Sequence, residues 1–426
     1  GYQSLYTLNA TGGNGYNVGV GYQAGYGMTS GVQNILIGSA TGDALTSGSY
    51  NVAIGHAALS TEDAHGKNVA VGHNSLLVQN AGADAYNVAV GFEAGKAVTT
   101  GIKNTSIGAR TMQATTVGQE NVALGYQAMY TNVDGSKCVA IGANALLTQE
   151  PASAVDMYNV AVGYNAGYAM TTGIENVIIG AQAGDALTTA NSNVIIGTYA
   201  AGATTVGAEN VVAGSHAMFT NVGGTASVAI GKNALYYQNP GASNTTMGNV
   251  AVGTGAGQDI ANAKWNTAIG YQSQFNATTG EFNTSVGTLS MGVGVTTGDA
   301  NVAIGYYAGY NLTSGSTNTL VGQEAGDALT GGADNVAIGF RSLSTEQGYG
   351  KNVAIGREAL EVLNAGADGY NVAVGYQAGH AVTTGVRNTL IGGLAGDAIT
   401  EGLYNIAIGY QALSANVDSD SNVAIG

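Results

Sequence analysis

Four aspartates recur in near-identical segments of the form Gly-Asp-Ala-Leu/Ile-Thr, and they are the first candidates for chemistry: Asp43, Asp185, Asp327 and Asp397. Carboxylate oxygens are hard ligands, but Ca²⁺ takes roughly six to eight of them. The four copies lie too far apart along the chain to share one ion. We therefore favour a turn-stabilising role, and an ion held jointly by several chains is the alternative.

The histidines offer no recognisable catalytic or metal-binding pattern. His56, His65, His73, His216 and His380 fall at scattered positions with no spaced His/Cys cluster. No nucleophile-elbow motif accompanies a Ser, His and Asp set. The few acidic residues lie in expected loops and imply no paired carboxylates for glycan hydrolysis. The sequence predicts no enzyme activity, no metal and no cofactor.

Tyrosine is the common aromatic residue, with 24 copies against 5 Phe and 1 Trp. Exposed aromatic rows can stack on sugars, whereas packing over a turn is the favoured alternative. The candidate surface-binding residues follow a repeated glycine: Tyr22, Tyr126, Tyr164, Tyr271, Tyr306, Tyr376 and Tyr410. Threonine pairs such as Thr99-Thr100 suggest an ice-binding array, but they occur in only some repeats.

These residues are carried by a phrase close to Asn-Val-Ala-Ile-Gly that returns 24 times, mostly at intervals of 17 residues. So short and regular a period is typical of a stacked solenoid. We number each coil from this Asn as position 1. The phrase begins at residues 17, 34, 51, 68, 87, 104, 121, 138, 159, 176, 193, 210, 227, 249, 266, 283, 301, 318, 335, 352, 371, 388, 405 and 422.

Alternation within the phrase predicts a short strand. Position 2 is Val, Ile or Thr, position 4 is almost always Val, Ile or Leu, and position 3 is usually Ala. We expect the β-branched pair at 2 and 4 to be buried, leaving Ala at 3 on an outer wall that a partner must cover. Position 8 is always small and predicts tight packing. An apolar position 12 predicts a second strand over positions 11–14, with a turn near position 15.

Two positions of the phrase predict structural roles. Position 5 is Gly in every copy, which indicates a turn with positive φ or a close backbone approach; the examples are Gly21, Gly38, Gly55, Gly72, Gly91, Gly108, Gly305 and Gly375. The Asn at position 1 predicts a ladder of side-chain amides between coils, beginning with Asn17, Asn34, Asn51, Asn68, Asn87, Asn104 and Asn121. Cys138 and Ser227 interrupt this ladder.

Composition excludes several classes of protein. The chain has 426 residues, of which 9% are charged and 45% hydrophobic, with 69 Gly, 2 Pro and a net charge of −15. Disordered chains are poorer in apolar residues and richer in charge, and collagen needs Gly at every third residue. One Cys excludes a disulfide framework. Without clustered Lys or Arg, or an apolar run long enough to span a bilayer, we expect neither nucleic-acid binding nor a membrane span.

The coils are grouped in a second layer of order. Types of coil recur about every 70 residues, which divides one continuous all-β solenoid over 1–426 into super-repeats 17–86, 87–158, 159–248, 249–300, 301–370 and 371–426. Duplication of a multi-coil unit explains this pattern. The chain begins and stops in mid-coil without capping units, so we expect it to be a stretch of a longer fibre.

The phrase Asn-Val-Ala-Ile-Gly-x-x-Ala resembles the head repeat of trimeric autotransporter adhesins (YadA-like heads) over nearly the whole chain. The 17-residue form, with Gly-Tyr-Gln-Ala-Gly-Tyr and Thr-Thr-Gly-x-x-Asn, also looks like repeats of phage tail-fibre proteins. The resemblance implies a left-handed parallel β-roll of three identical chains. The expected function is a virion fibre shaft that holds a host-attachment tip and joins further fibre or virion proteins. The alternative is a bacterial surface adhesin or extracellular filament that binds cell-surface glycans.

Overall fold

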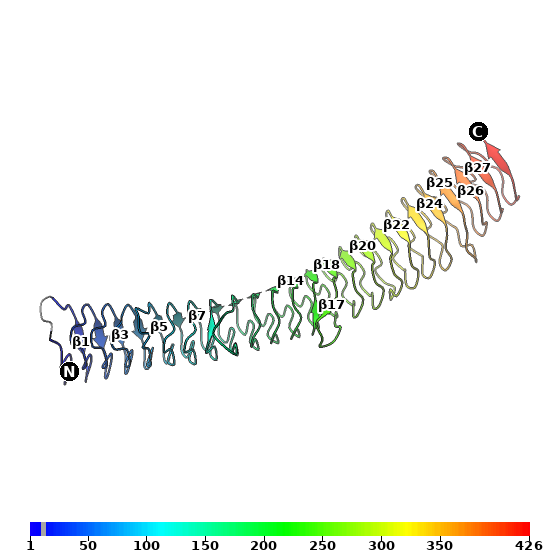
Figure 1. Ribbon diagram of the computed structural model, residues 1–426. Coiled ribbons are helices and arrows are strands. Elements are labelled where there is room, and N and C mark those ends of the chain that lie inside the picture. Colours follow the sequence, from blue (N-terminus) through cyan, green and yellow to red (C-terminus); the bar gives the residue numbers. More distant parts are fainter. Residues whose placement is uncertain (10–13) are drawn as a thin grey trace. The chain divides into compact units, whose positions relative to one another are not determined.

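The computed structural model describes residues 1–9 and 14–426, and these residues form an all-β parallel solenoid of about 24 turns with a repeat of about 17 residues. It consists of two compact units, residues 1–209 and 210–426. Each coil contributes one short strand, and successive strands pair in parallel without a register shift, as Val52 does with Val69 (Figure 1). The predicted fold class is therefore confirmed.

The first unit holds the main strands β1(Val18–Val20), β2(Ile35–Ile37), β3(Val52–Ile54), β4(Val69–Val71), β5(Val88–Val90), β6(Thr105–Ile107), β7(Val122–Leu124), β9(Val139–Ile141), β11(Val160–Val162), β12(Val177–Ile179) and β13(Val194–Ile196). A separate two-residue pair, β8(Gly135–Ser136) and β10(Val155–Asp156), joins a longer loop to the coil before it.

The second unit repeats the arrangement with β14(Val211–Ala213), β16(Val228–Ile230), β18(Val250–Val252), β19(Thr267–Ile269), β20(Thr284–Val286), β21(Val302–Ile304), β22(Thr319–Val321), β23(Val336–Ile338), β24(Val353–Ile355), β25(Val372–Val374), β26(Thr389–Ile391), β27(Ile406–Ile408) and β28(Val423–Ile425). The short pair β15(Gly224–Thr225) and β17(Thr245–Thr246) again secures a longer loop.

The side of the strand that faces the core is the opposite of the side predicted from the sequence. In β3 the central Ala53 is fully buried, whereas Ile54 is 36% exposed. The same pattern holds in β12, where Ile178 is buried and Ile179 is 38% exposed. The prediction that positions 2 and 4 are buried was wrong, and so was the outer wall of Ala. Positions 1 and 3 share the inner face, because strand side chains alternate with a period of two.

The narrowness of the coil explains this inversion. The strand faces a wall built from position 8, where residues such as Ala24, Ala58 and Ala378 are fully buried. So little room remains that position 3 is usually Ala. Where position 3 is Leu, position 9 is Gly: an added Cβ at Gly326 would lie 2.8 Å from Leu320 Cδ2. The β-branched side chains at 2 and 4 have space only outside the coil.

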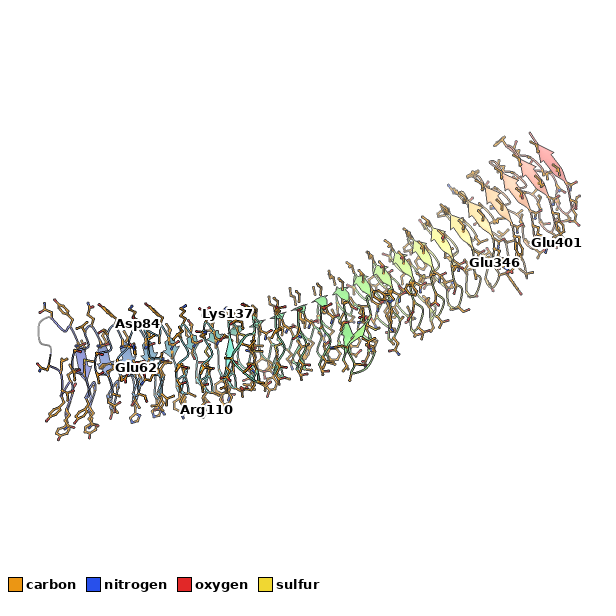
Figure 2. All side chains as sticks on the ribbon, viewed as in Figure 1. Glu62, Asp84, Arg110, Lys137, Glu346 and Glu401 are labelled. Atoms are coloured by element: carbon orange, nitrogen blue, oxygen red, sulfur yellow. The ribbon has the colours of Figure 1, made fainter. Side chains whose placement is uncertain are left out.

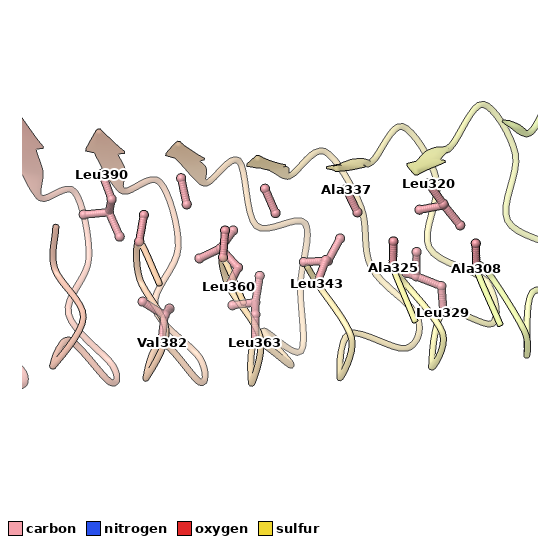
Figure 3. Packing of buried hydrophobic residues seen from close by; sticks show 14 of the residues in the cluster. Ala308, Leu320, Ala325, Leu329, Ala337, Leu343, Leu360, Leu363, Val382 and Leu390 are labelled. Atoms are coloured by element: carbon pink, nitrogen blue, oxygen red, sulfur yellow. The ribbon is translucent and has the colours of Figure 1, made fainter. Parts of the chain in front are cut away.

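The core of each unit therefore lies between the strand and the opposite turns. In the second unit Leu320, Leu343, Leu360 and Leu390 occupy this space together with the alanines (Figure 3). Position 12 supplies the far side of the core, as Met28 and Leu45 do in the first unit. Tight packing at position 8 and apolar character at position 12 are thus both present.

The second predicted strand is absent from the described residues: positions 11–14 form turns, bends and irregular backbone, with one isolated parallel bridge between Ala277 and Thr296. Left-handed residues interrupt the extended backbone on both sides, for example Leu59 (φ 52°) at position 9 and Lys67 (φ 63°) at position 17. Backbone bonds between coils continue here without a strand, as from Thr29 N–H to the Thr46 carbonyl at 2.8 Å. The unit boundary after Glu209 lies inside the super-repeat 159–248, so the units do not follow that division.

Candidate functional site

All eight predicted turn glycines have a positive φ, from 129° at Gly108 to 142° at Gly375. The space at this position also excludes a side chain, as the backbone angle does. A Cβ on Gly305 would lie 2.4 Å from the carbonyl oxygen of Gly322, the same position in the next coil. At this corner the glycine of one coil therefore lies directly against the glycine of the next coil. A side chain here would collide with backbone atoms, which cannot rotate away as a side chain can.

The position-1 asparagines form a buried ladder in which amide groups bond mainly to backbone. Each Oδ1 accepts the backbone N–H of the next position-1 residue, as between Asn87 and Asn104 at 2.8 Å. The Nδ2 of Asn104 donates to the Gly118 carbonyl in its own coil, also at 2.8 Å. The N–H to Oδ1 bonds link the seven predicted residues in sequence: Asn17, Asn34, Asn51, Asn68, Asn87, Asn104 and Asn121.

The two interruptions of the ladder are bridged by buried glutamines that the sequence reasoning missed. Gln149 Oε1 accepts from Asn159 Nδ2 at 3.1 Å, and its Nε2 donates to the sulfur of Cys138 at 3.2 Å. Gln238 makes the equivalent contacts with Asn249 and Ser227. The available signal was that each substituted Asn is followed by a Gln eleven residues later, at a position that is usually apolar.

Positions 2 and 4 form an outward apolar face, which we call the Val/Ile face. In each coil of both units two of these side chains lie on the outside of the sheet, and Val20, Ile196 and Ile304 are 53%, 42% and 40% exposed. No charged residue occupies either position. The sequence analysis had placed the surface to be covered on the opposite face of the strand, at the position-3 alanines, which are instead buried inside the coil.

The seven candidate tyrosines are 48–70% exposed: Tyr22, Tyr126, Tyr164, Tyr271, Tyr306, Tyr376 and Tyr410. They do not form a row, because coils without Tyr at position 6 separate them. Tyr22 stacks on Tyr2 at 5.9 Å between ring centroids, and Tyr306 packs edge-on against Tyr307 at 4.2 Å. Packing against a neighbouring ring therefore accompanies exposure at these sites.

Aromatic stacks occur where position 6 carries other rings. His56 stacks on His73 at 5.0 Å, and His73 on Phe92 at 5.4 Å, so one row crosses three successive coils. A search of position 6 for any aromatic residue, and not for Tyr alone, would have revealed this row in the sequence. In the second unit Phe219 and Tyr236 stack beside a surface hollow of about 340 Å³, lined by His216, Lys232, Asn233, Tyr236, Tyr237 and Gln258.

The recurring aspartates lie at a turn and differ in their partners. Asp43 accepts a hydrogen bond from the Ser60 hydroxyl of the next coil at 2.6 Å. Asp327 and Asp397 each keep one buried oxygen with no partner among the described residues. Burial raises the pKa of Asp327 to about 6, because the charged carboxylate is desolvated. The structure places no two of these residues together.

Threonine hydroxyls at position 13 are engaged with backbone. Thr99 donates to the Thr116 carbonyl at 3.2 Å, and Thr383 to that of Thr400 at the same distance. These hydroxyls therefore join coils, which explains the threonines without an ice-binding array.

Three of the longer loops that connect coils are each held by contacts among a Lys, an Asp and a Tyr side chain. The sequence analysis did not predict these contacts. Lys67 Nζ lies 2.7 Å from Asp84 Oδ2 and donates to the Tyr86 hydroxyl at 2.9 Å. Figure 2 labels Asp84 of this set and Lys137 of the next. The equivalent sets are Lys137, Asp156 and Tyr158, and Lys351, Asp368 and Tyr370. The lysine lowers the pKa of Asp84, but each pair is exposed to solvent and therefore adds little to stability.

Two groups of acidic and histidine side chains have ligand atoms within 4.8 Å of one another: Glu62, Asp63 and His65, and Glu358, Glu361 and His380. The sequence analysis singled out neither group: the first lies within four consecutive residues, and the second brings together residues of two adjacent coils.

The sequence matches no protein-family model and no curated protein. Within residues 1–9 and 14–426 no helix is long and apolar enough to cross a lipid bilayer.

Proposed function

We propose that this chain is a shaft segment of an extracellular fibre, in which three copies pack through their Val/Ile faces. The observation that carries the proposal is that face. A monomeric protein rarely exposes an apolar patch above about 300–600 Å², yet every coil adds two more uncharged side chains, which are β-branched in nearly all coils. A second and a third copy of the chain offer the same flat surface with the same spacing between coils, which suits a symmetric assembly.

The continuous bonding between coils supports a spacer role. Within each unit, successive strands and the Asn ladder connect each coil to the next, so stiffness is distributed along the chain. The function proposed is to hold a host-attachment tip away from a phage or virus particle, with further fibre or virion proteins joined to the segment. The threefold number and the left-handed coil come from the resemblance to YadA-like heads and phage fibres.

Mass in solution tests the assembly. The expected result is a species of about three times 42.3 kDa at micromolar chain concentration, measured by light scattering or native mass spectrometry. A folded monomer that persists at this concentration contradicts the proposal.

Electron microscopy of virions labelled with an antibody against the chain tests the location, and the expected label lies along the fibres.

The second candidate function is a bacterial adhesin or filament that binds cell-surface glycans along the shaft. The half-exposed tyrosines and the hollow beside Tyr236 favour it, because aromatic faces flanked by amide and amine groups suit sugars. A glycan array probed with the purified chain is the test. Binding that Tyr236→Ala removes supports this candidate, whereas an array without signal counts against it.

A further inference from the structure

Glu62 places a carboxylate where most coils have an apolar side chain. It lies at position 12 and is fully buried. One oxygen, Oε1, accepts the backbone N–H of His65 at 3.2 Å. The other, Oε2, has no hydrogen-bond partner among the described residues. A buried carboxylate without compensation is costly, so this residue needs an explanation beyond the turn it closes.

Two further ligand atoms lie beside this carboxylate. His65 Nδ1 is 3.8 Å from Glu62 Oε1 and is itself buried without a hydrogen-bond partner in the described part of the chain. Asp63, which is exposed, adds a carboxylate, and one ligand atom from each of Glu62, Asp63 and His65 lies within 4.8 Å of the other two. One turn of four residues thus presents one imidazole nitrogen and two carboxylates, with one side open to solvent.

The coil over residues 335–351 is an internal control. It has the same turn with Glu346 in place of Glu62, equally buried, but Gln347 and Tyr349 replace Asp63 and His65 (Figure 2 labels both glutamates). Glu346 Oε1 accepts from the N–H groups of Gln347 and Tyr349 at 3.1 and 3.2 Å. Its Oε2 accepts from Ala365 N–H at 3.2 Å. The turn therefore forms with backbone partners alone and does not need the Asp or the His.

We propose that Glu62, Asp63 and His65 bind a divalent transition-metal ion, with Zn²⁺ the best match. Zinc accepts imidazole nitrogen and carboxylate oxygen together, in sites with three protein ligands and an open position for water. The uncompensated Glu62 carboxylate supplies the charge that holds the ion. Zinc holds such ligand atoms at about 2.0–2.2 Å, so binding is expected to draw the Asp63 and His65 side chains together around the ion.

The second acidic group does not share these properties. Glu361 is already paired with Arg341 Nη1 at 2.8 Å and with His380 Nε2 at 2.8 Å. Glu358 is paired with Arg357 and accepts from Gln377 Nε2 at 2.7 Å. These charges are compensated within the protein, so the group serves as a control site for the experiment.

Zinc titration of the chelator-treated full chain is the test, by calorimetry and with Co²⁺ as a spectroscopic probe. The expected result is one ion per chain. The Asp63→Gln/His65→Tyr variant, which copies the residues of the control coil, is expected to bind at least about tenfold more weakly, or 1.4 kcal/mol. His380→Gln is expected to leave affinity unchanged.

Three outcomes overturn the proposal. They are absence of Zn²⁺ and Co²⁺ binding by the intact chain at millimolar metal, unchanged binding by the double variant, and loss of binding in His380→Gln. Circular dichroism without metal checks that the variants are folded. If the double variant is not, imidazole NMR signals of the unaltered chain are followed instead. Zinc must then shift the His65 signal, and an unshifted His65 at saturation overturns the assignment.

Discussion

At the scale of the residue, the repeat is set by groups that cannot be exchanged. The position-5 glycine combines a left-handed backbone angle with a carbonyl oxygen where a Cβ would lie, and the position-1 Asn satisfies backbone groups in two coils. Both requirements arise because the coils stack in register. A substitution at one of these positions is therefore expected to disturb the neighbouring coils as well.

Substitution of Gly305 tests the turn. Gly305→Ala is expected to cost at least about 2 kcal/mol of unfolding free energy, from positive φ and the 2.4 Å approach to Gly322 O. Gly348→Ala is the matched control, because a Cβ there meets nothing within 4 Å. Denaturant unfolding and hydrogen exchange of the adjacent coils are the measurements. Equal effects of the two substitutions refute the assigned role.

The carboxylate of Asp327 predicts a pH dependence of stability. Its pKa rises from 3.8 to about 6 on folding because of burial. The folded state therefore binds more protons between these values, and stability falls as pH rises from about 4 to about 6. Asp327→Asn lacks this contribution. The difference in unfolding free energy between the two proteins is expected to change across this pH range, and a constant difference contradicts the prediction.

At the scale of the element, each coil has one strand whose small residues point inward and whose β-branched residues point outward. The pair Ala337 and Ile338 tests this direction, because the first is fully buried and the second is 37% exposed. Ala337→Asp is expected to cost more than about 3 kcal/mol by burying a charge. Ile338→Asp is expected to leave the coil folded, as judged by hydrogen-exchange protection of β22 to β24. The opposite order of effects contradicts the assigned faces.

At the scale of the whole molecule, the Val/Ile face is the surface through which the proposed trimer assembles. Two charges on that face, in Ile304→Asp/Ile338→Asp, are expected to shift the trimer toward monomer, since they would be buried against another chain. Ser314→Asp is the control, because it adds a charge at an exposed position outside the face. Light scattering measures the mass. A trimer that survives the double substitution at micromolar concentration excludes this face as the interface.

The sequence by itself determined the repeat, the turn glycines and the internal Asn contacts, because each depends on backbone that recurs at a fixed period. It could not determine which face of the strand is inside. The phrase alternates between Asn with Ala and Val with Ile, and apolar bulk alone favours burying the second pair. Only the tertiary structure decided for the first pair, because the strand faces the small residues of position 8 across a narrow core, where most coils hold Ala at position 3 and only a few hold a larger side chain such as Ile178.

The same limit applies to the candidate sites. Gln149 and Gln238 complete the Asn ladder from positions eleven residues away, and Glu62 Oε1 lies 3.8 Å from His65 Nδ1 within one turn. Their residue types were visible in the sequence. Their proximity was not, since it depends on how one coil closes and where the next coil lies above it.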